Sequence, residues 1–340
     1  MSFKRLDAED FLVSADAVTA ALWSNNSSTL SQFFSSSVQE ASSAGQYYLS
    51  VFQTSSVDAS AEVQFDIAFA QKDGSGSLYF NSAIPGKSPS RSIYGQYRNL
   101  VLGDENAQFV FGNVTGSRFY AVSVERSRYK EKLLAGTMTL TLSGSTGARL
   151  TLTDNSTVTN TVTFCDAGRL FQLVSGSAGA VFTGVNSNGY SANSGSYGFF
   201  LPDVGVLLLN AHALDTAPIS GGISLATGLS PNTNDNNNRK FFNAIARGAS
   251  TSMNSEETLT SDYVFIRARN SEFNYSENPS FVSGSTGEVL YANFINNPTT
   301  YMTTVGLYND NNDLLAVAKI SRPLPKDFTK EALIRVKLDF

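Results

Sequence analysis

The chain has 340 residues, of which 41% are hydrophobic and 16% charged, and its formal net charge is −5. Its 24 Phe and 14 Tyr supply enough apolar area to exclude an intrinsically disordered chain. The negative balance disfavours nucleic acid as a partner. There is no run of about 18 apolar residues and no signal-peptide pattern, so we expect no membrane span and synthesis in the cytosol.

Residues 1–46 differ from the rest, and we predict a short helical or extended arm there. Residues 6–23 are compatible with a helix that has Asp7 as its N-cap, and residues 29–44 form a second candidate helix. The arm can pack on its own chain or on a neighbouring subunit. Its aromatic candidates for an interface are Trp23, Phe33 and Phe34.

From residue 47 the pattern changes to the period-two alternation of strands. Residues 61–70 alternate Val, Phe and Ile with smaller or polar residues, and two Thr/Leu runs at 137–142 and 149–153 flank a Gly/Ser turn. Residues 206–209 are all apolar, which indicates a strand buried on both faces. We therefore predict an antiparallel β-sandwich-like domain over residues 47–220.

The remaining chain divides into a connector and a second β domain. Residues 221–260 are rich in turn-forming residues and contain a candidate helix at 239–249. A smaller β domain is expected over residues 261–340. It contains a hairpin with its loop at 309–313 and an alternating strand at 333–338. The predicted fold class is mostly β.

Residues 92–102 carry side chains typical of protein interfaces. Tyr94, Tyr97 and Arg98 are large, with rigid or planar ends, and such residues often contribute much of the binding energy at a contact. The alternative is that both tyrosines pack in the core of their own domain while Arg98 forms a local ion pair. The sequence leaves both interpretations open.

The densest charge run covers residues 125–132, with four bases and two acids. Arg126, Arg128 and Tyr129 make a contact with nucleic acid conceivable. The run is short and mixed in sign within an acidic protein, so we favour a solvated or subunit-bridging face. No nucleic acid partner is predicted.

No set of residues predicts catalysis, a metal site or a cofactor. His212 is the only histidine, there is no Gly-x-Ser-x-Gly motif, and Cys165 has no basic neighbour in sequence. We expect His212 to be a core or interface histidine and Cys165 a small buried hydrophobe. Asp104, Asp203 and Asp215 leave a glycan hydrolase as an alternative, although no motif selects them.

Three loops have some of the residues of a ligand site, and none of them fits a known pattern. The glycine pair at 74 and 76 precedes a strand-like run instead of a helix, and Pro85-Gly86-Lys87-Ser88 lacks the upstream glycine of a phosphate loop. Residues 230–238 are rich in Asn and Asp but lack the closing acid of a calcium loop.

Eight long segments, spread over nearly the whole chain, are VSADAVTAALWSNN, SQFFSSSVQEASSAG, YGQYRNLVLGDEN, ERSRYKEKLLAG, FNYSENPSF, PTTYMTTVGLYN, LLAVAKISRP and IRVKLDF. They resemble a family of virion structural proteins of T4-like tailed phages of marine bacteria and cyanobacteria.

The resemblance implies a structural component of the particle, located in the virion after synthesis in the host cytoplasm. We expect it in the contractile tail or baseplate, in contact with copies of itself and other virion proteins within a symmetric assembly, with no enzymatic activity. A capsid, collar or neck position, or a receptor- or glycan-binding module, is the alternative.

Overall fold

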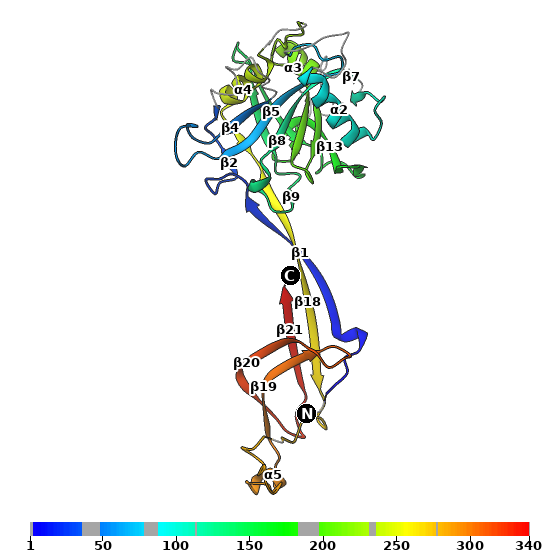
Figure 1. Ribbon diagram of the computed structural model, residues 1–340, viewed down its shortest axis with the longest axis vertical. Coiled ribbons are helices and arrows are strands. Elements are labelled where there is room, and N and C mark those ends of the chain that lie inside the picture. Colours follow the sequence, from blue (N-terminus) through cyan, green and yellow to red (C-terminus); the bar gives the residue numbers. More distant parts are fainter. Residues whose placement is uncertain are drawn as a thin grey trace. The chain divides into compact units, whose positions relative to one another are not determined.

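The computed structural model describes residues 3–35, 48–77, 88–112, 114–182, 197–230, 236–276 and 278–339 (Figure 1). The chain forms two compact units: a larger one, Val18–Glu257, and a smaller one made of Met1–Ala17 and Thr258–Phe340. Both consist mainly of β-strands, as predicted. Strands β1 (Phe11–Ala21) and β18 (Asn254–Ala268) each contribute residues to both units.

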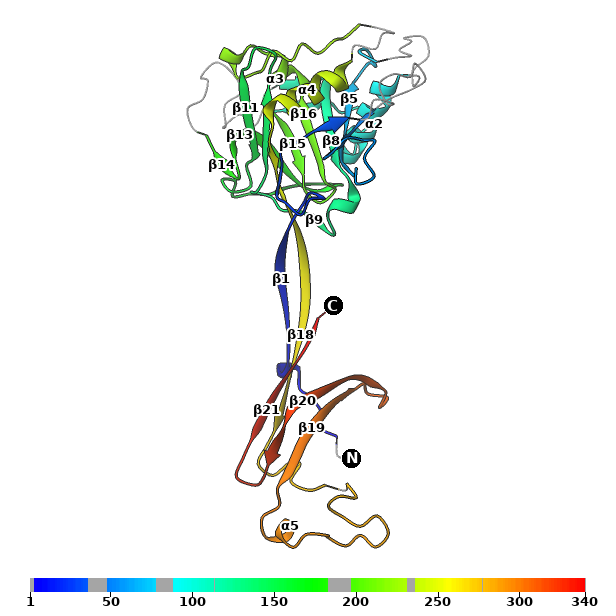
Figure 2. The ribbon, with the colours of Figure 1, turned by 90° about the vertical axis from the view of Figure 1, so that its left-hand side faces the viewer.

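In the described part of the larger unit, one antiparallel sheet of thirteen strands curls around a core (Figure 2). Its strands lie in the order β2 (Thr29–Leu30), β17 (Thr251–Ser252), β10 (Thr139–Ser143), β11 (Arg149–Asp154), β13 (Gly168–Ser177), β15 (Gly198–Leu201), β16 (Val206–Asn210), β8 (Arg118–Val124), β5 (Val63–Gln71), β4 (Tyr48–Phe52) and β3 (Phe34–Ser35). Strands β12 (Thr163–Cys165) and β14 (Ala180–Val181) pair with β13.

Both faces of this sheet are covered, and alternate residues of one strand enter different cores. In β8, Tyr120 and Val122 belong to the core inside the curl, whereas Phe119 and Ala121 belong to a second core on the other face. The strand β16 is buried along its whole length. A strand with two dry faces requires apolar residues at consecutive positions, which explains the continuous apolar runs in the sequence.

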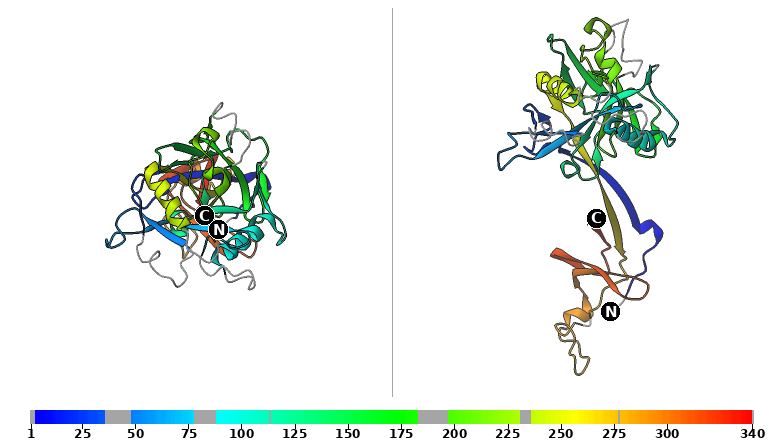
Figure 3. Two further views of the ribbon diagram at one scale, coloured as in Figure 1. Left: turned by 90° about the horizontal axis from the view of Figure 1, so that it is seen from above. Right: turned by 45° about the horizontal axis from the view of Figure 1, so that its top comes forward.

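Helices complete the two cores from different sides (Figure 3). Helix α4 (Asn237–Gly248) packs against β10, β5 and β4 inside the curl, and α2 (Pro89–Leu102) packs against β5 and β12 on the other face. Helix α2 begins with a proline in its first turn and ends at Gly103, whose φ of 63° is left-handed. The shorter elements are α3 (Ala211–Asp215), η2 (Arg126–Arg128), η3 (Pro218–Ser220), β6 (Phe109–Phe111), β7 (Val114–Gly116) and β9 (Lys132–Leu133).

In the described part of the smaller unit, two small sheets are present. Strand β18 pairs with β21 (Ala332–Asp339), and β1 lies on the other side of β18. Strands β19 (Thr300–Tyr308) and β20 (Leu314–Lys326) form a hairpin around the predicted loop, with Tyr308 opposite Leu314. The short helices are η1 (Ala8–Asp10) and α5 (Asn293–Asn296).

The predicted helical arm is wrong. Only the single turn η1 follows Asp7, and Phe11–Ala21 is the strand β1. The residues of the second candidate helix form the short strands β2 and β3, while residues 36–44 lie outside the described part. Pairing of β1 with β18, β2 with β17 and β3 with β4 supplies the hydrogen bonds of these segments, and tertiary pairing of this kind overrides weak helix propensity.

The predicted helix in the connector is confirmed as α4, but it belongs to the larger unit. Phe241, Ala244 and Ile245 are fully buried in the core inside the curl, where the Phe241 ring stacks on Tyr120 at 4.6 Å.

Among the described residues, none of the helices combines the length and hydrophobicity needed to span a membrane.

Candidate functional site

The smaller unit has a very thin core. Among its described residues, the buried hydrophobic side chains are Val264, Ala268, Ala332 and Val336, two of which are alanines. A two-stranded sheet such as β19–β20 is marginally stable on its own in water. The unit therefore buries little apolar surface for its size, and further burial against a partner would stabilise it.

The hairpin β19–β20 displays large apolar side chains on its outward face. Val317 lies opposite Gly306, and Leu314 lies opposite Tyr308. The exposed fractions are 57% for Val317, 53% for Leu314 and 39% for Tyr308. Tyr301, near the start of β19, is 56% exposed. Contiguous apolar surface of this kind indicates a protein contact.

Strand β1 is exposed on both of its faces. Phe11, Leu12 and Val13 are consecutive, so they point alternately to opposite faces, and they are 52%, 55% and 66% exposed. Val18, further along the strand, is 44% exposed. Val18 belongs to the larger unit, so we define Phe11, Leu12 and Val13 of β1 and the exposed apolar residues of the β19–β20 hairpin as the apolar strand surface.

A buried lysine fixes the base of the hairpin. Lys326 is fully buried, and its Nζ donates to the carbonyl oxygens of Asn270 and Asp327 at 3.0 Å each and to Asn274 Oδ1 at 2.8 Å. Opposite it, Thr300 Oγ1 donates to the Phe273 carbonyl at 2.6 Å. These bonds hold the hairpin against residues 270–274, so the hairpin part of the apolar strand surface has a defined position within its unit.

A long connection between β18 and β19 begins at this base and belongs to the same unit; we call residues 274–299 the excursion. It is rich in Tyr, Ser, Gly and Asn, the composition of recognition loops that combine rigid aromatic contacts with adaptable hydrogen bonds. Phe281 and Phe294 pack together at 5.4 Å, whereas Tyr275 and Tyr291 are 59% and 60% exposed. Long loops of this kind are often functional.

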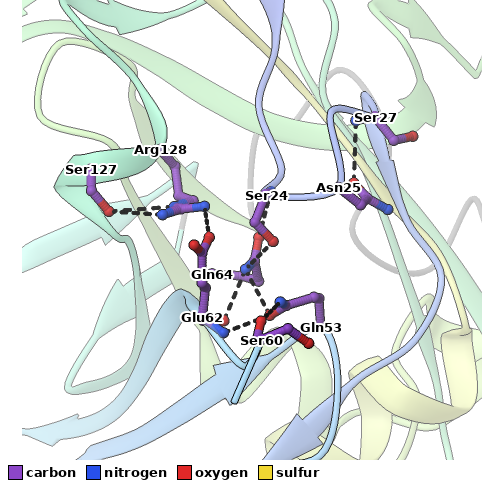
Figure 4. Close-up of polar contacts among 9 residues, drawn as sticks. All are labelled: Ser24, Asn25, Ser27, Gln53, Ser60, Glu62, Gln64, Ser127 and Arg128. Carbon is purple, nitrogen blue, oxygen red and sulfur yellow. Dashed lines mark hydrogen bonds and ion pairs between the residues drawn. The ribbon is translucent and has the colours of Figure 1, made fainter. Parts of the chain in front are cut away.

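A polar cluster in the larger unit surrounds Gln64 (Figure 4). This fully buried side chain lies within hydrogen-bond distance of Ser24 Oγ (2.8 Å), Gln53 Oε1 (3.1 Å) and the Glu62 carbonyl (2.9 Å), and its Oε1 accepts from the Ser24 N–H (3.1 Å). The cluster holds the residues that follow β1 against β5. The cluster supplies hydrogen-bond partners to the buried Gln64 side chain.

The aromatic residues of the expected arm differ in burial: one is buried, one is partly buried and one is exposed. Trp23 is 3% exposed, lies in the core inside the curl, and donates from Nε1 to the Ser28 carbonyl at 3.1 Å. Phe33 is partly buried against the same core, and Phe34 is 39% exposed. The interface interpretation of Trp23 is therefore wrong, because burial in its own unit already covers the ring. Phe34 retains an exposed face.

Tyr94 and Tyr97 lie in the second core, so the alternative that they pack within their own domain is the one the structure shows. They are 1% and 9% exposed, and the Tyr94 hydroxyl donates to the Gly116 carbonyl at 3.0 Å. Burial raises the pKa of both phenols. Arg98, on the same helix, is half-buried and its Nε has no partner. The spacing of Tyr94, Tyr97 and Val101, between Pro89 and Gly103, was the signal of a helix with a buried face.

The charged run folds back on its own unit. The guanidinium of Arg126 lies 4.6 Å from the centre of the Tyr129 ring and donates to the Lys130 carbonyl at 2.6 Å. Arg128 pairs with Glu62. Tyr129 is 5% exposed, so it is a core residue. Both arginines thus have local partners, and only Arg126 is exposed.

The carboxylates that left a glycan hydrolase as an alternative are each bound to a different local partner. Asp203 is paired with Arg169 (2.7 Å) and Asp215 with Arg118 (3.2 Å), while Asp104 accepts from the Asn106 N–H. His212 is exposed, which is wrong for the core position that was one of its two expectations, and its interface position stays a prediction.

Cys165 is half-buried, and burial raises the pKa of its thiol, which disfavours the reactive thiolate. The described part of the chain has no cluster of three or more His, Cys, Asp or Glu residues suited to a metal ion.

Comparisons of this chain with protein-family models, with curated proteins and with solved structures find no match. The functional interpretation therefore depends on the geometry of the two units and on the sequence resemblance. The residues of the apolar strand surface and Lys326 were not singled out as functional from the sequence. The available signal was the run of consecutive apolar residues Phe11, Leu12 and Val13 in a segment with strand-forming residues.

Proposed function

We propose that this chain is a structural subunit of a tailed-phage virion, placed in the contractile tail or baseplate, and that it acts through contacts with copies of itself and with other virion proteins. The observation that carries the assembly role is the apolar strand surface on a unit with only four buried hydrophobic side chains among its described residues. The virion assignment is supported by the resemblance alone.

The energetics favour a subunit that completes its core by association. Burial of apolar surface contributes about 25 cal/mol per Å², and stable interfaces bury about 1,200–2,000 Å² in total. The exposed side chains of β1 and β19–β20 offer that kind of surface, while the larger unit has two extensive cores of its own. We infer that the larger unit folds independently and that the smaller unit makes the subunit contacts.

The test has two parts. Sedimentation velocity on the purified chain at about 1–50 μM measures self-association, and a persistent monomer would contradict the assembly role. Immunogold labelling of intact phage particles locates the protein. Label at the distal end of the tail supports the baseplate, label on the capsid or neck favours the alternative position, and unlabelled particles would refute the virion assignment.

A second candidate, a receptor- or glycan-binding role, is favoured by the excursion 274–299 with its exposed Tyr275 and Tyr291. Aromatic rings and amide side chains suit an uncharged ligand such as a neutral glycan. Glycan-array binding by the wild-type chain, lost in the double variant Tyr275→Ala/Tyr291→Ala, would support this role. The absence of binding to every neutral glycan would count against it.

A further inference from the structure

Strand β1 has an unpaired edge in the described part of the chain. It pairs with β18 on one side and with no strand on the other, so the outward N–H and C=O groups along its length are available to another strand. Such an edge favours the addition of an extended backbone. The chemistry of the partner is therefore that of a β-strand.

Natural proteins protect exposed edges with charged side chains, proline or bulges. Strand β1 contains no proline and one charged residue, Asp16, in eleven residues. The other outer strand of the same sheet, β21, carries Arg335 and Lys337 on its exposed positions. The contrast between the two edges indicates that β1 is the edge that accepts a partner.

Symmetry restricts how β1 can pair with β1 of a second copy. A two-fold axis that relates adjacent antiparallel strands is perpendicular to the sheet, so it keeps each face on its own side. At the axis, a residue must lie opposite its own counterpart. The register is therefore fixed by the choice of one central residue.

Asp16, the only charged residue of β1, discriminates among the residues that could lie at the two-fold axis. An axis at Asp16 places two carboxylates directly opposite each other, which is destabilising. An axis at Ser14 places Asp16 opposite Leu12, and an axis at Ala17 places it opposite Val18. Both of these registers place Asp16 opposite an apolar side chain of the second copy, which offers the carboxylate no hydrogen-bond donor.

An axis at Ala15 gives Asp16 a hydrogen-bond donor and places apolar residues opposite apolar residues. Ser14 then lies opposite Asp16 of the partner subunit, so its hydroxyl can donate to that carboxylate. Leu12 lies opposite Val18 of the partner subunit, and Val13 lies opposite Ala17 of the partner subunit. Opposite residues of an antiparallel pair have Cβ atoms about 4.5–5.5 Å apart, close enough for these contacts.

We propose that two copies of this chain associate through antiparallel pairing of β1 with β1 about a two-fold axis at Ala15, which joins their sheets into one. This inference rests on the proposed assembly function and names the partner and register of one part of the apolar strand surface. The paired stretch runs from Phe11 to Thr19, so the exposed apolar side chains of β1 gain neighbours on both faces.

The test is a charge exchange at the axis. The variants Ala15→Lys and Ala15→Glu each place like charges opposite each other, so each alone should have half the assembly mass of the wild type in sedimentation velocity. Mixed in equal amounts, they place Lys opposite Glu and should restore the wild-type mass. Ala20→Lys, a matched control on the same strand beyond the paired stretch, should behave as wild type.

The outcomes separate this inference from the proposed function. If both single variants keep the wild-type mass while the wild type self-associates, the β1 pairing is refuted and the assembly function stands. If the mixture fails to restore the mass, the Ala15 register is refuted. If the wild type is monomeric at 50 μM, the assembly function itself is refuted. Circular dichroism of each variant should match the wild type, because Ala15 is exposed.

Discussion

Lys326 donates from its ammonium to Asn274 Oδ1 at 2.8 Å although its side chain is fully buried. Two backbone carbonyls, of Asn270 and Asp327, complete the set of acceptors for its three N–H groups. A buried ammonium is tolerated only when it is paired or fully hydrogen-bonded. The arrangement joins the end of β20 to the base of the excursion 274–299, so it couples the hairpin to that loop.

We expect Lys326→Met to destabilise the smaller unit by about 2–4 kcal/mol, since one buried and two part-buried acceptors lose a charged donor. The matched control is Lys330→Met, whose side chain is 56% exposed and pairs with Asp327, and it should change stability by less than about 0.5 kcal/mol. Hydrogen exchange of residues 269–276 and 300–326 measures the effect. Unchanged protection in Lys326→Met would show that the buried ammonium contributes no local stability.

In the larger unit, the Arg169–Asp203 pair should make stability depend on pH. Burial alone would raise the pKa of Asp203, but the side-chain and backbone hydrogen bonds from Arg169 and its charge lower the pKa below the usual value of 3.8. A lowered carboxyl pKa contributes stability above pH 3.8 that is lost as the pH falls through the folded-state value. Asp203→Asn should therefore lose most stability near neutral pH.

We expect that loss to be about 1–2 kcal/mol at pH 7, because the Arg169 and Asp203 side chains retain 25% and 29% exposure. Urea unfolding of the larger unit at pH 7 and pH 3 measures it. The difference between wild type and Asp203→Asn should shrink at pH 3. A difference of equal size at both pH values would show that the loss is due to packing, not charge. Asp104→Asn, at an exposed carboxylate, is the control.

Asp66 should show the opposite sign. Burial raises the pKa of this carboxyl, although the hydroxyl of Ser50 donates to its Oδ1 at 2.6 Å, and the negative charge of Glu125 raises it further. Ionisation therefore destabilises the native state, and the penalty is absent below pH 3.8 and complete above the folded-state pKa. Asp66→Asn removes the charge and retains an acceptor for Ser50.

Asp66→Asn should raise the melting temperature at pH 7 by about 2–4 °C, the shift that 1 kcal/mol produces in a domain of this size. At pH 3 the variant and the wild type should melt together. Differential scanning calorimetry at the two pH values measures both. A lower melting temperature for Asp66→Asn at pH 7 would mean that the carboxylate makes a stabilising contact in its ionised form.

The β-rich class was predictable because the strands of the larger unit follow simple patterns. The alternation around Phe65 and Ile67 and the apolar run at Leu207 and Leu208 both report burial directly. The N-terminal strand was not predictable from local sequence. Its alanines suit a helix or a strand, and the choice depends on the pairing with β18, which lies more than 230 residues away in sequence.

The candidate site was predicted less well than the fold. Large amphipathic side chains such as Tyr94 and Tyr129 are common both in cores and at interfaces, so residue type alone does not separate the two. The structure places both in cores. The apolar strand surface could not be located from sequence, because whether an apolar residue of β1 is covered depends on which strands lie beside it.

Tyr97 contributes an aromatic ring to the core of the larger unit. Its side chain is 9% exposed in the second core and its ring contacts Phe119 at 6.1 Å between centres. We expect Tyr97→Ala to destabilise the larger unit by about 3 kcal/mol or more, because truncation of a buried aromatic ring leaves a cavity. Gln96→Ala, one position earlier and exposed, should change stability by less than about 0.5 kcal/mol. Urea unfolding of both variants measures the contrast. A Tyr97→Ala variant with native stability and impaired self-association would instead identify Tyr97 as an interface residue and contradict its place in the core.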